Sequence, residues 1–186
     1  MIRRTAESPT ALILVLASLV LSLARPALAK DAADIEADAR AALVDLYIAA
    51  PAAKALSEKS VAVLVFPSII KAGFIVGGQY GEGVLFKNDE AAGFYNSVAG
   101  SYGLQAGAQK FGYALFFMTD SSARYLDKSE GWEIGTGPSI VLVDEGMARS
   151  MTTTTLKGDI YAFTFDQKGL MAGLGIQGTK VTRIGK

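Results

Sequence analysis

The chain has 186 residues, with 18 basic and 18 acidic side chains and neither histidine nor cysteine. The missing residue types exclude a Ser-His-Asp triad, a thiol nucleophile, a His/Cys zinc site and a disulfide framework, which leaves Ser/Lys or carboxylate chemistry. Nucleic-acid binding depends on clustered Lys and Arg, and the balanced charge gives no basis for it. We expect no nucleic-acid partner, no metal and no cofactor.

Residues 1–29 have the pattern of a cleavable signal peptide. Two arginines near the start precede an uncharged run over 11–23, and Ala27-Leu28-Ala29 has the small-x-small pattern that signal peptidase accepts. The uncharged run has 13 residues, whereas a helix that crosses the hydrocarbon core needs about 20. We therefore predict cleavage near Ala29, and a periplasmic or secreted mature chain that begins near Lys30.

Residues 31–59 are predicted to be helical. Apolar residues recur at three- and four-residue steps over 31–50, where Asp31 favours the helix N-terminus. Pro51 divides this helix from a second, shorter one over 52–59. The polar face of the first helix is mostly acidic, which is unsuited to anionic membranes, so we expect the helix to cover the core.

From residue 60 to residue 186 the pattern changes to strands. Candidate strands lie at 61–66, 83–86, 93–98, 113–118, 139–143, 159–165 and 180–184, with turn-forming residues at 87–90, 157–159 and 166–169. The continuous apolar run before Pro67 is typical of a strand buried on both faces and stopped by the proline. One helix is predicted over 121–128, with Asp120 or Ser121 as its N-cap.

A weak internal repeat of glycines is the most informative pattern. The repeat is Gly, large apolar, any, small apolar, Gly, and it occurs at Gly73 and Gly77, at Gly103 and Gly107, and at Gly169 and Gly173. Paired glycines on one face of a strand allow a bend, a bulge or close approach of another backbone or a ligand. We predict one domain over 30–186 of the α+β class. In it, N-terminal helices pack on a strongly curved, Gly-rich, largely antiparallel sheet that bends towards a barrel.

One short motif suggests catalysis. Ser68 and Lys71 match the Ser-x-x-Lys of penicillin-recognising enzymes, but the Ser-Asp-Asn and Lys-Thr-Gly elements that this chemistry needs do not occur. A Ser/Lys hydrolase is therefore the least favoured of our three functional hypotheses, and we expect a protein that is not an enzyme.

Several ordered blocks resemble the SYLF domain, a lipid-binding module also described as an actin-regulator domain in yeast. The blocks are Val63–Leu85, Gly103–Gln109, Phe117–Asp120, Gly131–Gly135 and Phe165–Gly173. The resemblance implies a non-enzymatic domain that binds membrane lipids, phosphoinositides in eukaryotic members. Those members use a basic N-terminal segment, whereas the segment here is acidic and the chain is predicted to be exported by a bacterium. Lipid binding carries over to this chain, but actin and phosphoinositide selectivity do not.

We therefore expect an exported, monomeric protein that binds phospholipid at the bacterial envelope or a membrane surface, with anionic head groups as candidate ligands. Lys71 and Lys110 are expected at the head groups, and Phe74, Tyr80 and Phe111 at the acyl boundary. A lysine near an anionic surface contributes about 1 kcal/mol, so apolar contact must supply most of the affinity. The alternatives are that these lysines are solvated strand ends and these aromatics core, and that the protein is an envelope interaction module without a lipid ligand, binding another protein through its sheet edge or helix face.

Overall fold

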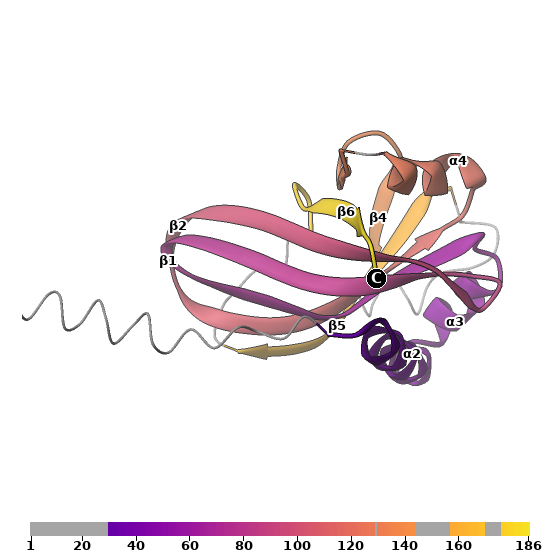
Figure 1. The fold of residues 1–186 in the computed structure, drawn as a ribbon, viewed down its shortest axis with the longest axis horizontal. Helices are drawn as coiled ribbons and strands as arrows, with labels where there is room; N and C mark the ends of the chain where they lie inside the picture. The colour runs from indigo at the N-terminus through magenta and orange to yellow at the C-terminus, as the bar shows by residue number, and fades with distance from the viewer. Residues whose placement is uncertain (1–29, 129, 144–156, 170–175) are drawn as a thin grey trace, which may run out of the picture. The chain divides into compact units, whose positions relative to one another are not determined.

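The computed structural model describes residues 30–128, 130–143, 157–169 and 176–186, and Asp31–Lys186 form one compact unit. Its elements are the helices α2 (Ala32–Ala49) and α3 (Pro51–Ser57), the long strands β1 (Ala62–Lys87) and β2 (Glu90–Phe117), the short helix α4 (Asp120–Ala123) with the 3-10 helix η1 (Arg124–Asp127), and the strands β3 (Trp132–Glu133), β4 (Ile140–Val143), β5 (Ile160–Gly169) and β6 (Lys180–Ile184). The fold is α+β with a strongly curved, Gly-rich sheet, as predicted (Figure 1). Within the described residues, no helix is long and apolar enough to cross a membrane.

The N-terminal helices form where the sequence predicts them. The carboxylate of Asp31 caps α2 by accepting a hydrogen bond from the backbone N–H of Ala33, at 3.3 Å. Pro51 is the first residue of α3, where its missing N–H has no cost. The inner side of α2, with Ile35 and Leu46, packs on the sheet, so the predicted role of this helix in covering the core is confirmed.

The sheet is built around one long antiparallel ribbon of β1 and β2, which have 26 and 28 residues. The two strands meet at Asn88 and Asp89, whose φ values of 52° and 62° make the turn of the primed type that matches strand twist. The first part of β2 pairs with β6, and its last part pairs with β5. The ribbon therefore forms two arms of one sheet. The first arm pairs residues 62–74 of β1 with 106–117 of β2, and the second arm pairs residues 76–87 of β1 with 90–102 of β2. Among the described strands, β4 and β5 form the only parallel pair.

Both strands of the ribbon turn back between the two arms, at a point that we call the bend (Figure 1). Between the pairs Phe74–Ala106 and Val76–Tyr102, β2 contains two more residues than β1. A Cβ atom on Gly73 would overlap the Cα atom of Gly77. The first two members of the glycine repeat therefore lie at the bend, whereas Gly169 ends β5 and Gly173 lies outside the described residues.

The second arm of β1 crosses closely over its first arm. A Cβ atom on Gly83 would overlap the carbonyl oxygen of Val65 and the ring of Phe66, and one on Gly81 would lie 2.5 Å from the carbonyl oxygen of Ser68. Real Cβ atoms essentially never approach other atoms so closely. Backbone therefore packs on backbone at this crossing, which only glycine permits.

Three local predictions are wrong. Pro67 does not end its strand, because β1 continues through a bulge between Phe66 and Ile69, where the missing N–H is tolerated. The turn predicted at 166–169 is a bulge within β5, with Asp166 at a φ of 57°. The helix predicted over 121–128 is present as α4 followed by η1. Its cap, however, is Thr119 and not Asp120 or Ser121, because the Thr119 hydroxyl accepts from the N–H of Ser122 at 3.2 Å.

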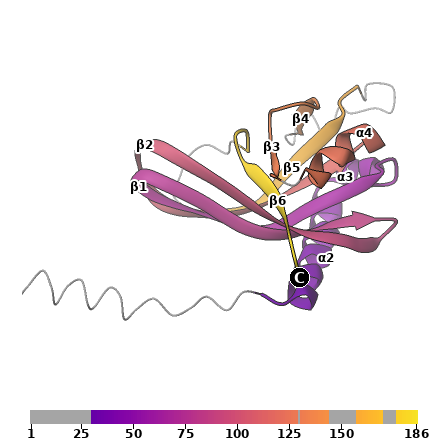
Figure 2. The same ribbon diagram turned by 45° about the horizontal axis from the view of Figure 1, so that its top comes forward.

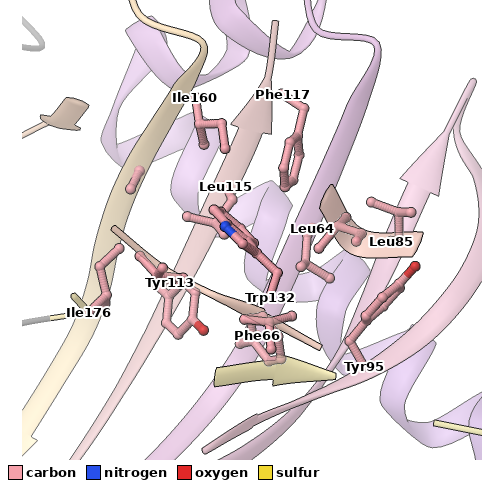
Figure 3. Packing of buried hydrophobic residues seen from close by; sticks show 14 of the residues in the cluster. Leu64, Phe66, Leu85, Tyr95, Tyr113, Leu115, Phe117, Trp132, Ile160 and Ile176 are labelled. Carbon is pink, nitrogen blue, oxygen red and sulfur yellow. The ribbon is translucent and has the colours of Figure 1, made fainter. Parts of the chain in front are cut away.

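Two hydrophobic clusters hold the sheet from its two faces. The first lies inside the curve, where Trp132 packs with aromatic and aliphatic side chains of both arms (Figure 3). The second lies between the helices and the outer face of the sheet and includes Val63, Val65, Val84 and Phe86. Because these strand residues lie far from the bend in sequence, α2 covers the other end of the ribbon, as both views show (Figure 1, Figure 2).

The crossing predicts the effect of a single methyl group. Gly83→Ala is expected to lower the free energy of unfolding by roughly 1–3 kcal/mol, because the new Cβ atom forces the two arms of β1 apart. Urea unfolding followed by circular dichroism measures this. Gly100→Ala is the matched control, since a Cβ atom there meets nothing within 4 Å, and its effect should stay within about 0.5 kcal/mol. Equal effects of the two variants would contradict the crossing.

Candidate functional site

The outer face of the ribbon near the bend carries exposed apolar side chains. The helices cover this face only at the other end. Four large apolar residues near the bend are between 43% and 65% exposed, and we call them the bend patch: Ile70, Val76, Tyr80 and Val98. Single exposed apolar residues are ordinary, but several grouped on one part of a surface indicate an interaction site.

The strand register explains why these residues are exposed. On β1, Leu64 and Phe66 point into the core, so simple alternation would bury Ile70 and expose Lys71. The bulge between Phe66 and Ile69 reverses this order. Ile70 is exposed as a result, and Lys71 is half-buried on the inner face.

Three residues of the bend patch lie in two cross-strand pairs, one on each arm of the ribbon. Tyr80 lies directly opposite Val98, and Ile70 lies opposite Lys110. The positions between these pairs are small, because Ala72 pairs with Ala108 and Gly78 pairs with Gly100. Small residues therefore separate the two pairs from the bend, where Val76 lies.

Three exposed lysines border the bend patch, and we call them the lysine border. Lys110 and Lys168 lie directly opposite each other on β2 and β5, an arrangement of like charges that costs stability. Lys180 lies opposite Val98 on one side and Glu133 on the other. Lys168 also has Asp166 at 3.9 Å. Local acids therefore offset part of the charge, and the border is weakly cationic.

Tyr80 has a fixed hydroxyl and an exposed ring. The hydroxyl donates to Glu82 at 2.9 Å, and the other oxygen of this carboxylate lies 3.2 Å from the amine of Lys186. Partial burial raises the pKa of Tyr80, and the hydrogen bond to Glu82 raises it further. A ring held in this way presents an apolar surface with a neutral polar end, as aromatic residues at membrane–water boundaries do.

The residues predicted for lipid contact divide between the two faces. Lys110 and Tyr80 are exposed on the outer face, whereas Lys71 faces inward and has Gln109 as its cross-strand partner. Phe111 is only 1% exposed and belongs to the inner core, which is the alternative position expected for these aromatic residues. Phe74 is paired with Ala106 at the bend, and its side chain lies outside the described residues.

The inner face near the bend contains buried polar groups that the sequence did not indicate. The Tyr113 hydroxyl donates to Ser97 at 2.8 Å, and the Gln79 amide donates to Thr179 at 3.0 Å. Complete burial raises the pKa of Tyr113 far above its usual range, so this phenol stays neutral. The Gln109 side-chain oxygen is buried and has no hydrogen-bond partner among the described residues.

A polar cleft of about 310 Å³ lies between the helices, the start of β1 and the Asn88-Asp89 turn. The Arg40 guanidinium dominates it, but this group already donates to the Glu36 carboxylate at 2.7 Å and to the Asp89 carbonyl at 3.0 Å. It also lies 4.7 Å from the centre of the Phe86 ring. An anionic ligand would have to displace these partners, so we assign the cleft no binding role.

The remaining chemical motif finds no support in the side-chain geometry. In the part of the chain that the structure describes, no hydrogen bond joins Ser68 to Lys71. The described residues also contain no group of three acidic, histidine or cysteine side chains placed to hold a metal.

Comparison with known proteins adds no relative, because no family model matches the sequence and no curated protein matches it significantly.

The buried pair of Tyr113 and Ser97 predicts an asymmetric mutational effect. Tyr113→Phe leaves the Ser97 hydroxyl buried without its partner, which should lower the free energy of unfolding by about 1–3 kcal/mol. The double variant Tyr113→Phe/Ser97→Ala removes both groups and should lose clearly less than the sum of the two single variants. Urea unfolding of the four proteins completes the cycle, and strictly additive losses would show that the hydroxyls are not coupled.

Proposed function

We propose that this chain is an exported, non-enzymatic protein of the SYLF type that binds phospholipid membranes peripherally through the bend patch and the lysine border. The observation that carries the proposal is the group of exposed apolar side chains around the bend, directly beside lysines. Apolar residues next to cations match the two layers of a membrane surface, acyl chains below and phosphate groups above.

The energetics favour apolar contact over charge. Full burial of a side chain such as Val or Ile contributes about 1.5–3 kcal/mol, and a lysine near an anionic surface about 1 kcal/mol. The lysine border is partly offset by Asp166 and Glu133. The protein should therefore bind neutral membranes weakly and anionic membranes more tightly.

The backbone of the bend limits how deeply the protein inserts. Most backbone groups of the ribbon are paired between β1 and β2, but the register shift after Phe74 interrupts the pairing. An unpaired backbone group in hydrocarbon costs several kcal/mol. Contact at the level of the head groups and the first acyl carbons, about 5–10 Å deep, avoids this cost.

Vesicle co-sedimentation of residues 30–186 tests the proposal. These residues suffice for the test, because both hydrophobic clusters lie within the compact unit Asp31–Lys186. The wild type should bind phosphatidylcholine vesicles that contain phosphatidylglycerol more tightly than vesicles without it. Ile70→Gln/Val76→Gln should weaken binding to both kinds at least about tenfold. Lys110→Gln/Lys168→Gln should instead remove the preference for the anionic vesicles.

The matched control is Ile48→Gln, which changes an exposed apolar residue of α2 at the other end of the ribbon. It should bind vesicles like the wild type. Absence of binding to both kinds of vesicle, or bend variants that sediment like the wild type, would overturn the proposal.

Export makes a separate prediction about the N-terminus. When the full chain is produced in a bacterium, the protein outside the cytoplasm should begin near Lys30, since Ala27-Leu28-Ala29 supplies the cleavage pattern. Intact-mass spectrometry of cell fractions measures this. Replacing Ala27 and Ala29 by bulky residues should leave the precursor uncleaved, and a wild-type chain that keeps residues 1–29 in the cytoplasm would contradict export.

A further inference from the structure

The outer side of α2 carries a second apolar surface, separate from the bend patch. Ile48 is 77% exposed, the highest value among the large apolar residues, and Val44 is 57% exposed. Together with three exposed alanines they repeat at steps of four and three residues, and we call this set the α2 stripe: Ala33, Ala37, Ala41, Val44 and Ile48. This spacing places all five on one side of a helix.

The inner side of α2 is already used. Ile35, Ala39 and Leu46 are buried against the sheet, and helical periodicity places them opposite the α2 stripe. A helix with apolar residues on both sides is typical of one that is covered on both sides. Among the residues that the structure describes, only the inner side of α2 packs against other elements.

The charge beside the α2 stripe indicates what covers it. At 100° per residue, Asp34, Asp38 and Asp45 lie along one edge of the stripe. Arg40 lies on the other edge, where it binds Glu36 and the Asp89 carbonyl. The stripe is therefore an apolar seam with one acidic edge, which complements an apolar seam with a basic edge.

We propose that the α2 stripe is a docking surface for a basic amphipathic helix of another protein. Its partner would lay an apolar seam on Val44 and Ile48 and place lysines or arginines beside Asp34 and Asp45. This is the helix-in-groove type of recognition, with anchors at four- and three-residue steps and flanking charges that select the partner.

Other occupants fit this surface less well. An anionic membrane would be repelled by the acidic edge. A second copy of α2 packed antiparallel would place acidic edge against acidic edge, and like-charge contacts at the borders of a helix pair oppose pairing. The proposal is independent of lipid binding, since the α2 stripe and the bend patch lie at opposite ends of the ribbon (Figure 2).

Fluorescence anisotropy with labelled synthetic helices tests this on residues 30–186. The probes are an 18-residue amphipathic peptide of leucine and lysine and a peptide of the same pattern with glutamate in place of lysine. The protein should bind the lysine peptide and not the glutamate peptide. Ile48→Gln/Val44→Gln should weaken binding at least about tenfold, and Asp34→Asn/Asp45→Asn should weaken it and reduce its dependence on salt.

The matched control is Ile70→Gln/Val76→Gln, which removes bend-patch residues and should bind the lysine peptide like the wild type. The proposal is overturned if neither peptide binds, if both bind equally, or if the α2 variants bind like the wild type. It is also overturned if sedimentation velocity shows a wild-type dimer that Ile48→Gln abolishes, or if Ile48→Gln weakens vesicle binding. A dimer that Ile48→Gln abolishes would identify a second copy of the chain as the occupant of the α2 stripe. Weakened vesicle binding would identify a membrane as the occupant.

Discussion

The close crossing of the two arms of β1 is the contact on which the rest of the structure depends. Because Gly83 and Gly81 have no side chains, the second arm rests on the backbone of Val65 and Ser68. This contact fixes the curvature of the ribbon, and the curvature encloses the cluster around Trp132. It also leaves the outer face of both arms pointing away from the core, where the helices cover one end and the residues of the bend patch are exposed.

Local patterns predicted the elements whose signals are local. The α2 helix, its start at Asp31 and the turn at Asn88-Asp89 follow from periodicity, capping and turn chemistry, and all three are present. The length of β1 did not follow, because Pro67 and the glycines are ordinarily read as ends of strands. Their unfavourable propensities are offset by pairing with β2 over the whole ribbon, and this partner is remote in sequence.

The candidate site was predictable only in outline. The sequence directed attention to the glycine-rich segments and to Tyr80 and Lys110, which are exposed near the bend. Lys71 lies on the inner face because the bulge after Phe66 reverses the alternation of β1, and no local pattern reveals a bulge of this kind. Phe111 lies on β2, where it follows the alternation of the core residues Tyr113 and Leu115. The α2 stripe was hidden for a related reason. Alanine, valine and isoleucine in an amphipathic helix are ordinarily assigned to the core, and the exposed side is known only once the packing is known.

The turn at Asn88-Asp89 has a consequence for how the chain folds. Turn and neighbouring pairs are close in sequence, so the ribbon can start there within microseconds and lengthen pair by pair towards the bend. The pairs at its far end, such as Ala62 with Phe117, join residues more than fifty positions apart, and contacts of this separation slow folding. The start of β1 and the end of β2 are therefore the last parts of the ribbon to pair. Until then their apolar residues remain available to proteins that bind unfolded chains.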